Sequence, residues 1–263
     1  MSESLVISVF SKEWYFSNSL SLLGLIFSLS FFYLITKSGY IKKKQLKAKI
    51  TQIIGLLILF RYAISQTYQI FSDPVLWNVN HSLPFHLCGI SGIVSGVILI
   101  RYNQTLYEFL LLLGAPGALL SFLTPQINIP EPSFMYFDYF LSHTLILYAP
   151  LYLTIMHNKR PRVGAWLKIF IKTNTIILPI VFIINIFLYY GLGYKDVNYI
   201  YLMKPPEAEN PFIIGQWPYY IIGLQVVGFV HIILIYYVFN NYNKLRNYIQ
   251  MNRLKVIENK RTN

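Results

Sequence analysis

The chain has 263 residues, of which 55% are hydrophobic and only 12% are charged. A soluble domain of this length carries a much larger share of charged side chains on its surface. The composition therefore excludes an ordinary soluble protein and indicates one that spans a membrane several times. A net charge of +12 would suggest a nucleic-acid partner in a soluble protein. Here no basic platform interleaved with aromatic residues lies outside the loops, so we expect no nucleic-acid partner.

Long apolar runs recur along the whole chain. A helix that crosses a bilayer needs about 20 mostly apolar residues, and seven such segments predict an all-α, polytopic transmembrane helical bundle. The first is too far from the start, and lacks the flanks, to be a signal peptide, so we expect a retained span. No repeat of 20–50 residues appears, which favours a single transmembrane domain over residues 1–240 with a basic tail at 241–263. The predicted spans cover residues 16–36, 50–71, 84–101, 106–124, 137–157, 168–190 and 217–239.

Basic residues gather in alternate connections between these spans. Six lysines lie in 37–49, and further basic residues lie in the 157–168 connection and in the tail. Seventeen of the 22 Lys and Arg residues fall on this side and three on the other. The positive-inside rule therefore predicts an N-terminus outside and a C-terminus in the cytoplasm. We expect a multi-pass protein of the cell membrane whose partners are membrane lipids.

The second span carries a charge near its middle. Arg61 lies within "LLILFRYAISQTYQ", and Gln66 follows it toward the predicted outer side. A charge in the hydrocarbon region is costly, so we expect Arg61 to face the bundle interior and to be paired. Its functional interpretation is a phosphate-binding or carboxylate-orienting group. The alternative is a structural partner of helix carbonyls or of Glu108.

The third span opens with "HSLPFHLC" (81–88), which gathers His81 and His86 beside the only cysteine, Cys88. With Pro84 in the first turn, Cys88 lies about four residues into the span, some ~6 Å at 1.5 Å per residue. The dipole at a helix N-terminus favours an anion and so raises the thiolate fraction of a cysteine. A single cysteine excludes an internal disulfide. In the fourth span, Pro116 within "GAPGA" predicts a kink.

The fifth span carries His143 within "YFLSHTLIL", roughly ~9 Å below its predicted outer end. His143 and Cys88 are thus expected at nearly the same depth, on different helices. A histidine beside a thiol can act as base and then as acid in acyl transfer. His86 lies two residues from Cys88, about 200° around a helix, so the two side chains should point apart. His81 could fold over the site from the loop, and His143 is the preferred partner.

Each of these residues also has a structural interpretation. A lone membrane cysteine is often a small apolar filler, and a histidine near the interface is often a hydrogen-bonded structural residue. Three histidines and a thiol could bind a metal, but the H-x4-H-x-C spacing matches no strong zinc pattern. We therefore expect no metal. No Walker A, GxGxxG or GxSxG motif is present, and we expect no cofactor.

Several of these segments resemble the YwaF family of bacterial integral membrane proteins, which is grouped with eukaryotic transmembrane protein 164. The eukaryotic relative is regarded as a lipid acyltransferase in which a cysteine carries the acyl group and a histidine assists. The resemblance implies Cys88 as nucleophile and His143 as base. The similar stretches are "LPFHLCGIS" (83–91), "GAPGALLSFLTPQINIPEP" (114–132), "FLSHTLIL" (140–147), "NYIYLMKPP" (198–206) and "GQWPYY" (215–220).

Two functional hypotheses follow. The first is a cysteine-dependent phospholipid acyltransferase or transacylase near the outer leaflet, with Cys88 and His143 catalytic and with donor and acceptor phospholipids as partners. In it, the expected substrate-binding residues are His86, His81, Arg61 and Gln66. The alternative is a non-enzymatic transporter or ligand-binding protein in which Arg61 and the histidines line a polar cavity. One broken span without an internal repeat makes the transporter hypothesis weaker.

Overall fold

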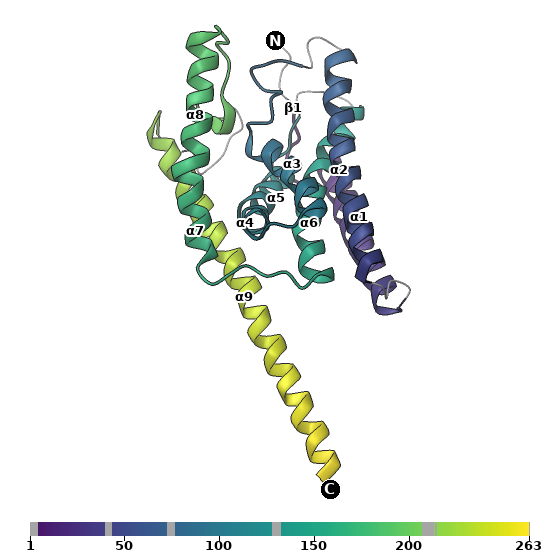
Figure 1. Ribbon diagram of the computed structural model, residues 1–263. Coiled ribbons are helices and arrows are strands. Elements are labelled where there is room, and N and C mark those ends of the chain that lie inside the picture. The colour runs from purple at the N-terminus through teal and green to yellow at the C-terminus, as the bar shows by residue number, and fades with distance from the viewer. Residues whose placement is uncertain are drawn as a thin grey trace.

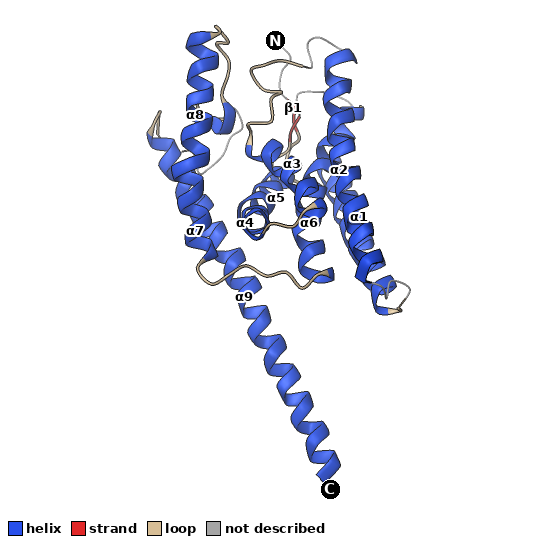
Figure 2. Ribbon diagram, viewed as in Figure 1, coloured by secondary structure: helices blue, strands red, loops and turns tan. Residues whose placement is uncertain are grey.

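The computed structural model describes residues 5–39, 44–72, 77–127, 133–206, 213 and 215–262, and these form helices almost throughout (Figures 1 and 2). Residues 128–132, the end of the stretch 114–132 quoted above, lie outside the described residues. The helices are α1 (Lys12–Lys37), α2 (Lys44–Ser72), α3 (Leu87–Ile100), α4 (Gln104–Phe109), α5 (Ala115–Leu123), α6 (Phe134–Met156), α7 (Ala165–Lys172), α8 (Leu178–Ile186) and α9 (Tyr219–Thr262).

Short irregular elements connect or extend these helices. Single π-helical turns join α4 to α5 (Leu110–Gly114) and α7 to α8 (Thr173–Ile177), and a third extends α8 (Phe187–Gly191). A 3-10 turn covers Tyr199–Tyr201. The strands β1 (Leu5–Val6) and β2 (Gln126–Ile127) pair antiparallel, with Leu5 opposite Ile127.

Within the described residues, six helical stretches are long and apolar enough to cross a membrane, and α3 is a further apolar helix of only 14 residues. The all-α class and the multi-pass membrane character are thereby confirmed. The total of seven spans and the orientation of the ends stay predictions. The six stretches cover Lys12–Lys37, Gln45–Ser72, Gln104–Leu123, Phe134–Met156, Ala165–Gly191 and Tyr219–Asn241.

The centre of the bundle holds α3, α4, α5 and α6, with α1 and α2 on one side and α7, α8 and α9 on the other (Figure 1). Leu110, Leu112 and Ala149 are fully buried there. The fourth predicted span is irregular just before Pro116, where Ala115 N–H donates to Leu110 O, five residues back. A π-helical turn next to a proline lets the helix continue although the proline lacks an N–H.

Helix α3 starts later than expected. The predicted span began at residue 84, but the helix begins at Leu87, with His86 as the N-cap, and residues 77–86 are non-helical. Ser82 does not cap this helix and accepts a hydrogen bond from Asn78 N–H at 3.0 Å. Ser82 N–H in turn donates to Asn78 O at 2.8 Å. These local turn bonds compete with the helix and shorten it.

Two glycines fix how α2 and α3 lie against each other. A Cβ at Gly55 would meet Gly96 O at 2.6 Å, and a Cβ at Gly96 would meet Leu59 Cγ at 2.6 Å. Only residues without a side chain permit this approach. At the far end of the same contact, Gln52 Nε2 donates to Ile100 O at 3.5 Å. Because α2 and α3 run antiparallel, the residues after Gly55 lie beside the residues before Gly96.

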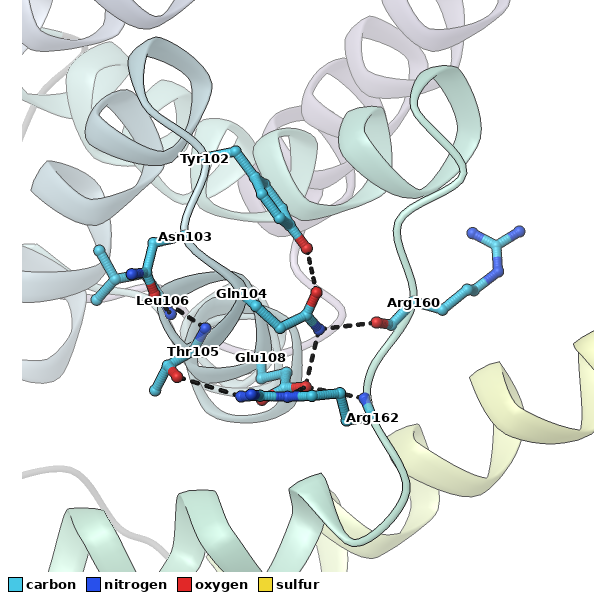
Figure 3. Close-up of polar contacts among 8 residues, drawn as sticks. All are labelled: Tyr102, Asn103, Gln104, Thr105, Leu106, Glu108, Arg160 and Arg162. Atoms are coloured by element: carbon cyan, nitrogen blue, oxygen red, sulfur yellow. Dashed lines mark hydrogen bonds and ion pairs between the residues drawn. The ribbon is translucent and has the colours of Figure 1, made fainter.

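The connection after α6 is clamped to α4 by a buried carboxylate (Figure 3). Glu108 is fully buried, and Arg162 donates to both of its oxygens, at 2.9 Å from Nε and 2.6 Å from NH2. Arg162 N–H and Gln104 Nε2 each add a bond of 2.8 Å to Oε1. The bonds to Glu108 raise the pKa of Arg162 above its ordinary value. Glu108 is therefore not the partner of Arg61, which corrects that alternative.

Removing the Arg162 side chain should destabilise the bundle. An Arg162→Ala variant leaves a buried carboxylate with two of its donors missing. The expected loss is on the order of 2 kcal/mol of unfolding free energy, less than for a fully buried pair because Arg162 is half exposed. Thermal unfolding in detergent measures it.

The matched control is Lys204→Ala, which breaks the exposed 3.7 Å pair with Asp196 and should change little. Equal melting temperatures for the two variants would contradict the clamp.

Candidate functional site

Arg61 is paired inside the bundle. Its NH1 lies 3.0 Å from Asp138 Oδ1 and donates to Asp138 O at 3.2 Å. Ser65, one turn further along α2, donates to Asp138 Oδ2 at 2.7 Å. Asp138 is buried. Arg61 thus faces the interior and is paired, as expected, and it joins α2 to α6.

Asp138 and Ser65 were missed by reasoning from the sequence. The signal for Asp138 was present, because an acidic residue inside an apolar span invites the same question as Arg61. Gln66, expected to bind substrate, is half-buried on α2. In the described part of the chain it makes no hydrogen bond to this group, and Gln69 is the amide that reaches Ser65, at 3.5 Å.

Cys88 and His143 lie at one level of α2. The α2–α3 contact pairs Gly55 with Gly96, and Cys88 is close enough to Tyr62 to influence its ionisation. On α6, His143 lies one to two turns from Asp138 and is close enough to Arg61 for their charges to interact. Adjacent residues of α2 thus lie within electrostatic reach of the thiol and of the imidazole. The expectation of similar depth fits this register, and their action as a pair stays a prediction.

The level itself is deeper than expected. Ten residues separate Tyr62 from the end of α2 at Ser72, about 15 Å at 1.5 Å per residue. His143 is nine residues from the start of α6, about 14 Å. The sequence had suggested about 6 Å for Cys88, from a span that starts at residue 84, and about 9 Å for His143, from a span that starts at residue 137. Part of this distance lies outside the hydrocarbon, because the 29 residues of α2 span about 43 Å against about 30 Å for the hydrocarbon core.

The thiol of Cys88 is exposed at the surface of the chain. It occupies the second residue of α3, and the N–H groups of Cys88 and Gly89 act on the sulfur. The first turn of a helix leaves such N–H groups without partners in the helix.

His143 is buried and held in one tautomer. Its Nδ1 lies 2.7 Å from Tyr139 O, and its ring packs against Tyr139 and Phe122, with centroids 4.3 and 6.2 Å away. A carbonyl oxygen only accepts, so Nδ1 carries the proton and Nε2 of the neutral ring keeps its lone pair. This is the tautomer a general base needs. No hydrogen bond joins His143 to Cys88 in the described structure.

His86 and His81 belong to a separate group of side chains, around the 199–201 turn. His86 Nδ1 accepts from Ile200 N–H at 3.4 Å, and its ring contacts Tyr199 and Tyr201 at 5.0 and 5.5 Å. His81 is exposed in the loop, close enough for its charge to act on His86. The structure therefore pairs Arg61 with Asp138, places His143 within electrostatic reach of Arg61, and leaves these two histidines with the 199–201 turn.

That turn is strained and tightly held. Ile200 and Tyr201 have φ values of 55° and 54°, which side chains with a Cβ rarely adopt. Fully buried Asn185 bonds both to Tyr199 O and to Tyr199 N–H at 2.9 Å. Burial raises the pKa of Tyr199 to about 12. Its hydroxyl donates to Val79 O and accepts from Leu83 N–H at 3.0 Å. The turn thus secures the non-helical segment before Cys88.

Comparison with protein families gives one match. The sequence pattern of the TMEM164 family matches residues 9–236. The chain belongs to the TMEM164 family. The family membership confirms the grouping with transmembrane protein 164 that the motifs suggested, and it supports an integral membrane protein. Neither the curated proteins nor the solved structures gave a match. Within the described residues, no group of three or more His, Cys, Asp or Glu side chains could hold a metal ion.

The ion pair of α2 and α6 can be tested by a double substitution. Arg61→Leu leaves the buried Asp138 carboxylate without its counter-ion, and the expected loss is on the order of 3 kcal/mol of unfolding free energy. Arg61→Leu/Asp138→Leu should recover most of it, because both charges are then absent. Thermal unfolding in detergent compares the three proteins. Additive losses in the double variant would contradict a direct pair.

Proposed function

We propose that this protein is a membrane enzyme that transfers acyl groups between phospholipids through Cys88, with His143 as the base. The observation that carries the proposal is the tautomer of His143. Its Nδ1–H is fixed on Tyr139 O, so Nε2 is the acceptor, at the level of an exposed thiol. The resemblance to the YwaF family implies the same two residues.

The reaction divides into two steps, acylation of Cys88 and transfer of the acyl group to a second lipid. His143 Nε2 takes the proton from Sγ of Cys88, and the thiolate attacks the carbonyl carbon of a lipid ester. The C–O bond breaks, the departing alcohol takes the proton from His143, and a thioester remains on Cys88. A hydroxyl of a second lipid then gives its proton to His143, attacks the thioester and carries the acyl group away. The thiolate recovers its proton from His143.

The start of α3 supplies donors for the negative oxygen that forms in each step. Ile90 N–H is bonded to His86 O at 3.0 Å. The N–H groups of the helical residues before Ile90 come too early in α3 to have a carbonyl partner within the helix. Such groups stabilise an oxyanion next to the nucleophile. Proton transfer requires Sγ and Nε2 to approach within about 3.5 Å or through one water.

We further propose that the chain crosses the cell membrane seven times, with α3 as a short third span. The N-terminus then lies outside and the C-terminus in the cytoplasm, and the site opens to the outer leaflet. The distribution of basic residues supports this orientation. Residues 1–240 form the transmembrane domain. The last part of α9, which extends well beyond the other helices in Figure 1, is the basic tail. Donor and acceptor phospholipids are the partners.

The alternative, a polar cavity lined by Arg61 and the histidines, has less support. The guanidinium of Arg61 is engaged by Asp138. His143 packs between aromatic rings, and His86 contacts the 199–201 turn. A carrier would need these groups around one space.

Trapping of the acyl-enzyme tests the proposal. In membranes supplied with an alkynyl fatty-acyl phospholipid, the wild-type chain should acquire a hydroxylamine-labile adduct, and Cys88→Ala should acquire none. His143→Asn should slow adduct formation by about 10²-fold or more, because the base is lost.

The matched control is His231→Asn. His231 of α9 has the same arrangement, with Nδ1 2.7 Å from Val227 O, and should behave as wild type. An adduct that persists in Cys88→Ala, or equal effects of the two histidine changes, would overturn the proposed mechanism.

A further inference from the structure

A cavity lies between α1, α5 and α6. Its volume is about 370 Å³, within the range of roughly 300–1,000 Å³ found for ligand pockets. Along α1 it extends from Trp14 to Leu25, eleven residues or about 16 Å of helix. The cavity is therefore long along the bundle axis, the direction in which lipid chains lie.

The interior of this cavity is apolar. Leu22, Leu25, Leu119 and Leu147 contribute to its walls. The polar groups near Trp14 mostly bond within the wall, because Trp14 Nε1 donates to Leu123 O at 3.0 Å. Such a lining favours a hydrocarbon ligand over a polar solute.

Asn18 also belongs to the wall near this end. Its Nδ2 donates to Trp14 O at 2.9 Å and to Phe122 O at 3.1 Å, which holds α1 to α5. Its Oδ1 is buried and has no hydrogen-bond partner in the described structure. A buried acceptor without a donor is costly, and a hydroxyl on a bound molecule would satisfy it.

Phe122 separates the cavity from the candidate base. Its ring lines the cavity and packs against His143, with 6.2 Å between centroids. Thr144, the neighbour of His143 on α6, also lines the cavity. One aromatic ring thus lies between a space for a hydrocarbon chain and the imidazole.

We infer that this cavity binds one acyl chain of a membrane lipid, with the polar end of the lipid toward Trp14 and Asn18. Its role as the subsite for a substrate chain rests on the proposed acyl-transfer function, whereas its occupancy by lipid does not.

Photolabelling tests the inference. The protein is placed in nanodiscs of phosphatidylglycerol, whose headgroup supplies hydroxyls, that contain a phosphatidylglycerol with a diazirine in one acyl chain, and labelled peptides are identified by mass spectrometry. In the wild-type chain, α1 and α6 should be labelled at cavity residues. Leu22→Trp fills the cavity and should reduce this labelling by about fivefold or more.

The matched control is Leu23→Trp on the same helix. Leu22 and Leu23 are 57% and 65% exposed, so the bundle tolerates a larger side chain at both, but only Leu22 lines the cavity. Labelling in Leu23→Trp should equal that of wild type. Equal labelling in the two variants, or label spread evenly over the lipid-facing surfaces of α2 and α9, would overturn the inference.

The same labelling in Cys88→Ala separates this inference from the proposed function. Occupancy does not need the thiol, so Cys88→Ala should be labelled at the cavity as wild type is. If no acyl adduct forms on Cys88 while Leu22→Trp still loses the label, the reaction fails and the lipid site stands. If the adduct forms but cavity labelling is absent, the lipid site fails and the reaction stands.

Discussion

The ion pair between Arg61 and Asp138 is the interaction on which the arrangement of the candidate site depends. Isolated charges in a bilayer are costly, so each partner needs the other, and the pair sets α2 against α6 at one register. Ser65 adds a third bond to the same carboxylate. Tyr62 follows Arg61 directly and lies within electrostatic reach of Cys88, while Gly55 and Gly96 set α3 against α2. The thiol and the imidazole reach a common level through α2 rather than through a bond of their own.

A second constraint shapes the approach to Cys88. The backbone before α3 is non-helical, and inside a membrane such backbone is tolerated only where protein or water satisfies its polar groups. The 199–201 turn meets this need through the Tyr199 hydroxyl, which bonds to Val79 O and to Leu83 N–H. Strain at Ile200 is offset by the bonds from Asn185. Two segments far apart in sequence therefore depend on each other.

Sequence reasoning located the long helices well because their apolar runs match the thickness of a bilayer. It placed the start of α3 too early, because Pro84 and Ser82 mimic a helix start, whereas Ser82 bonds to Asn78 in a turn. It also expected the interior charge of Arg61 but offered Glu108 as a partner. Pairing across helices depends on rotation and register, which hydrophobic runs do not specify. The tautomer of His143 was likewise beyond reach, since it depends on one carbonyl, Tyr139 O.

The family membership and the fold agree on a membrane protein, while the chemistry rests on the approach of two side chains. Cys88 is the only cysteine of the chain, so a His143→Cys variant has one defined pair of thiols. Linking of this pair by a short bifunctional thiol reagent, measured by mass spectrometry of the joined peptides, is the most direct test. The account predicts a link in His143→Cys and none in Leu145→Cys, whose side chain points about 200° away around α6. No link at position 143, or equal linking at both positions, would contradict it.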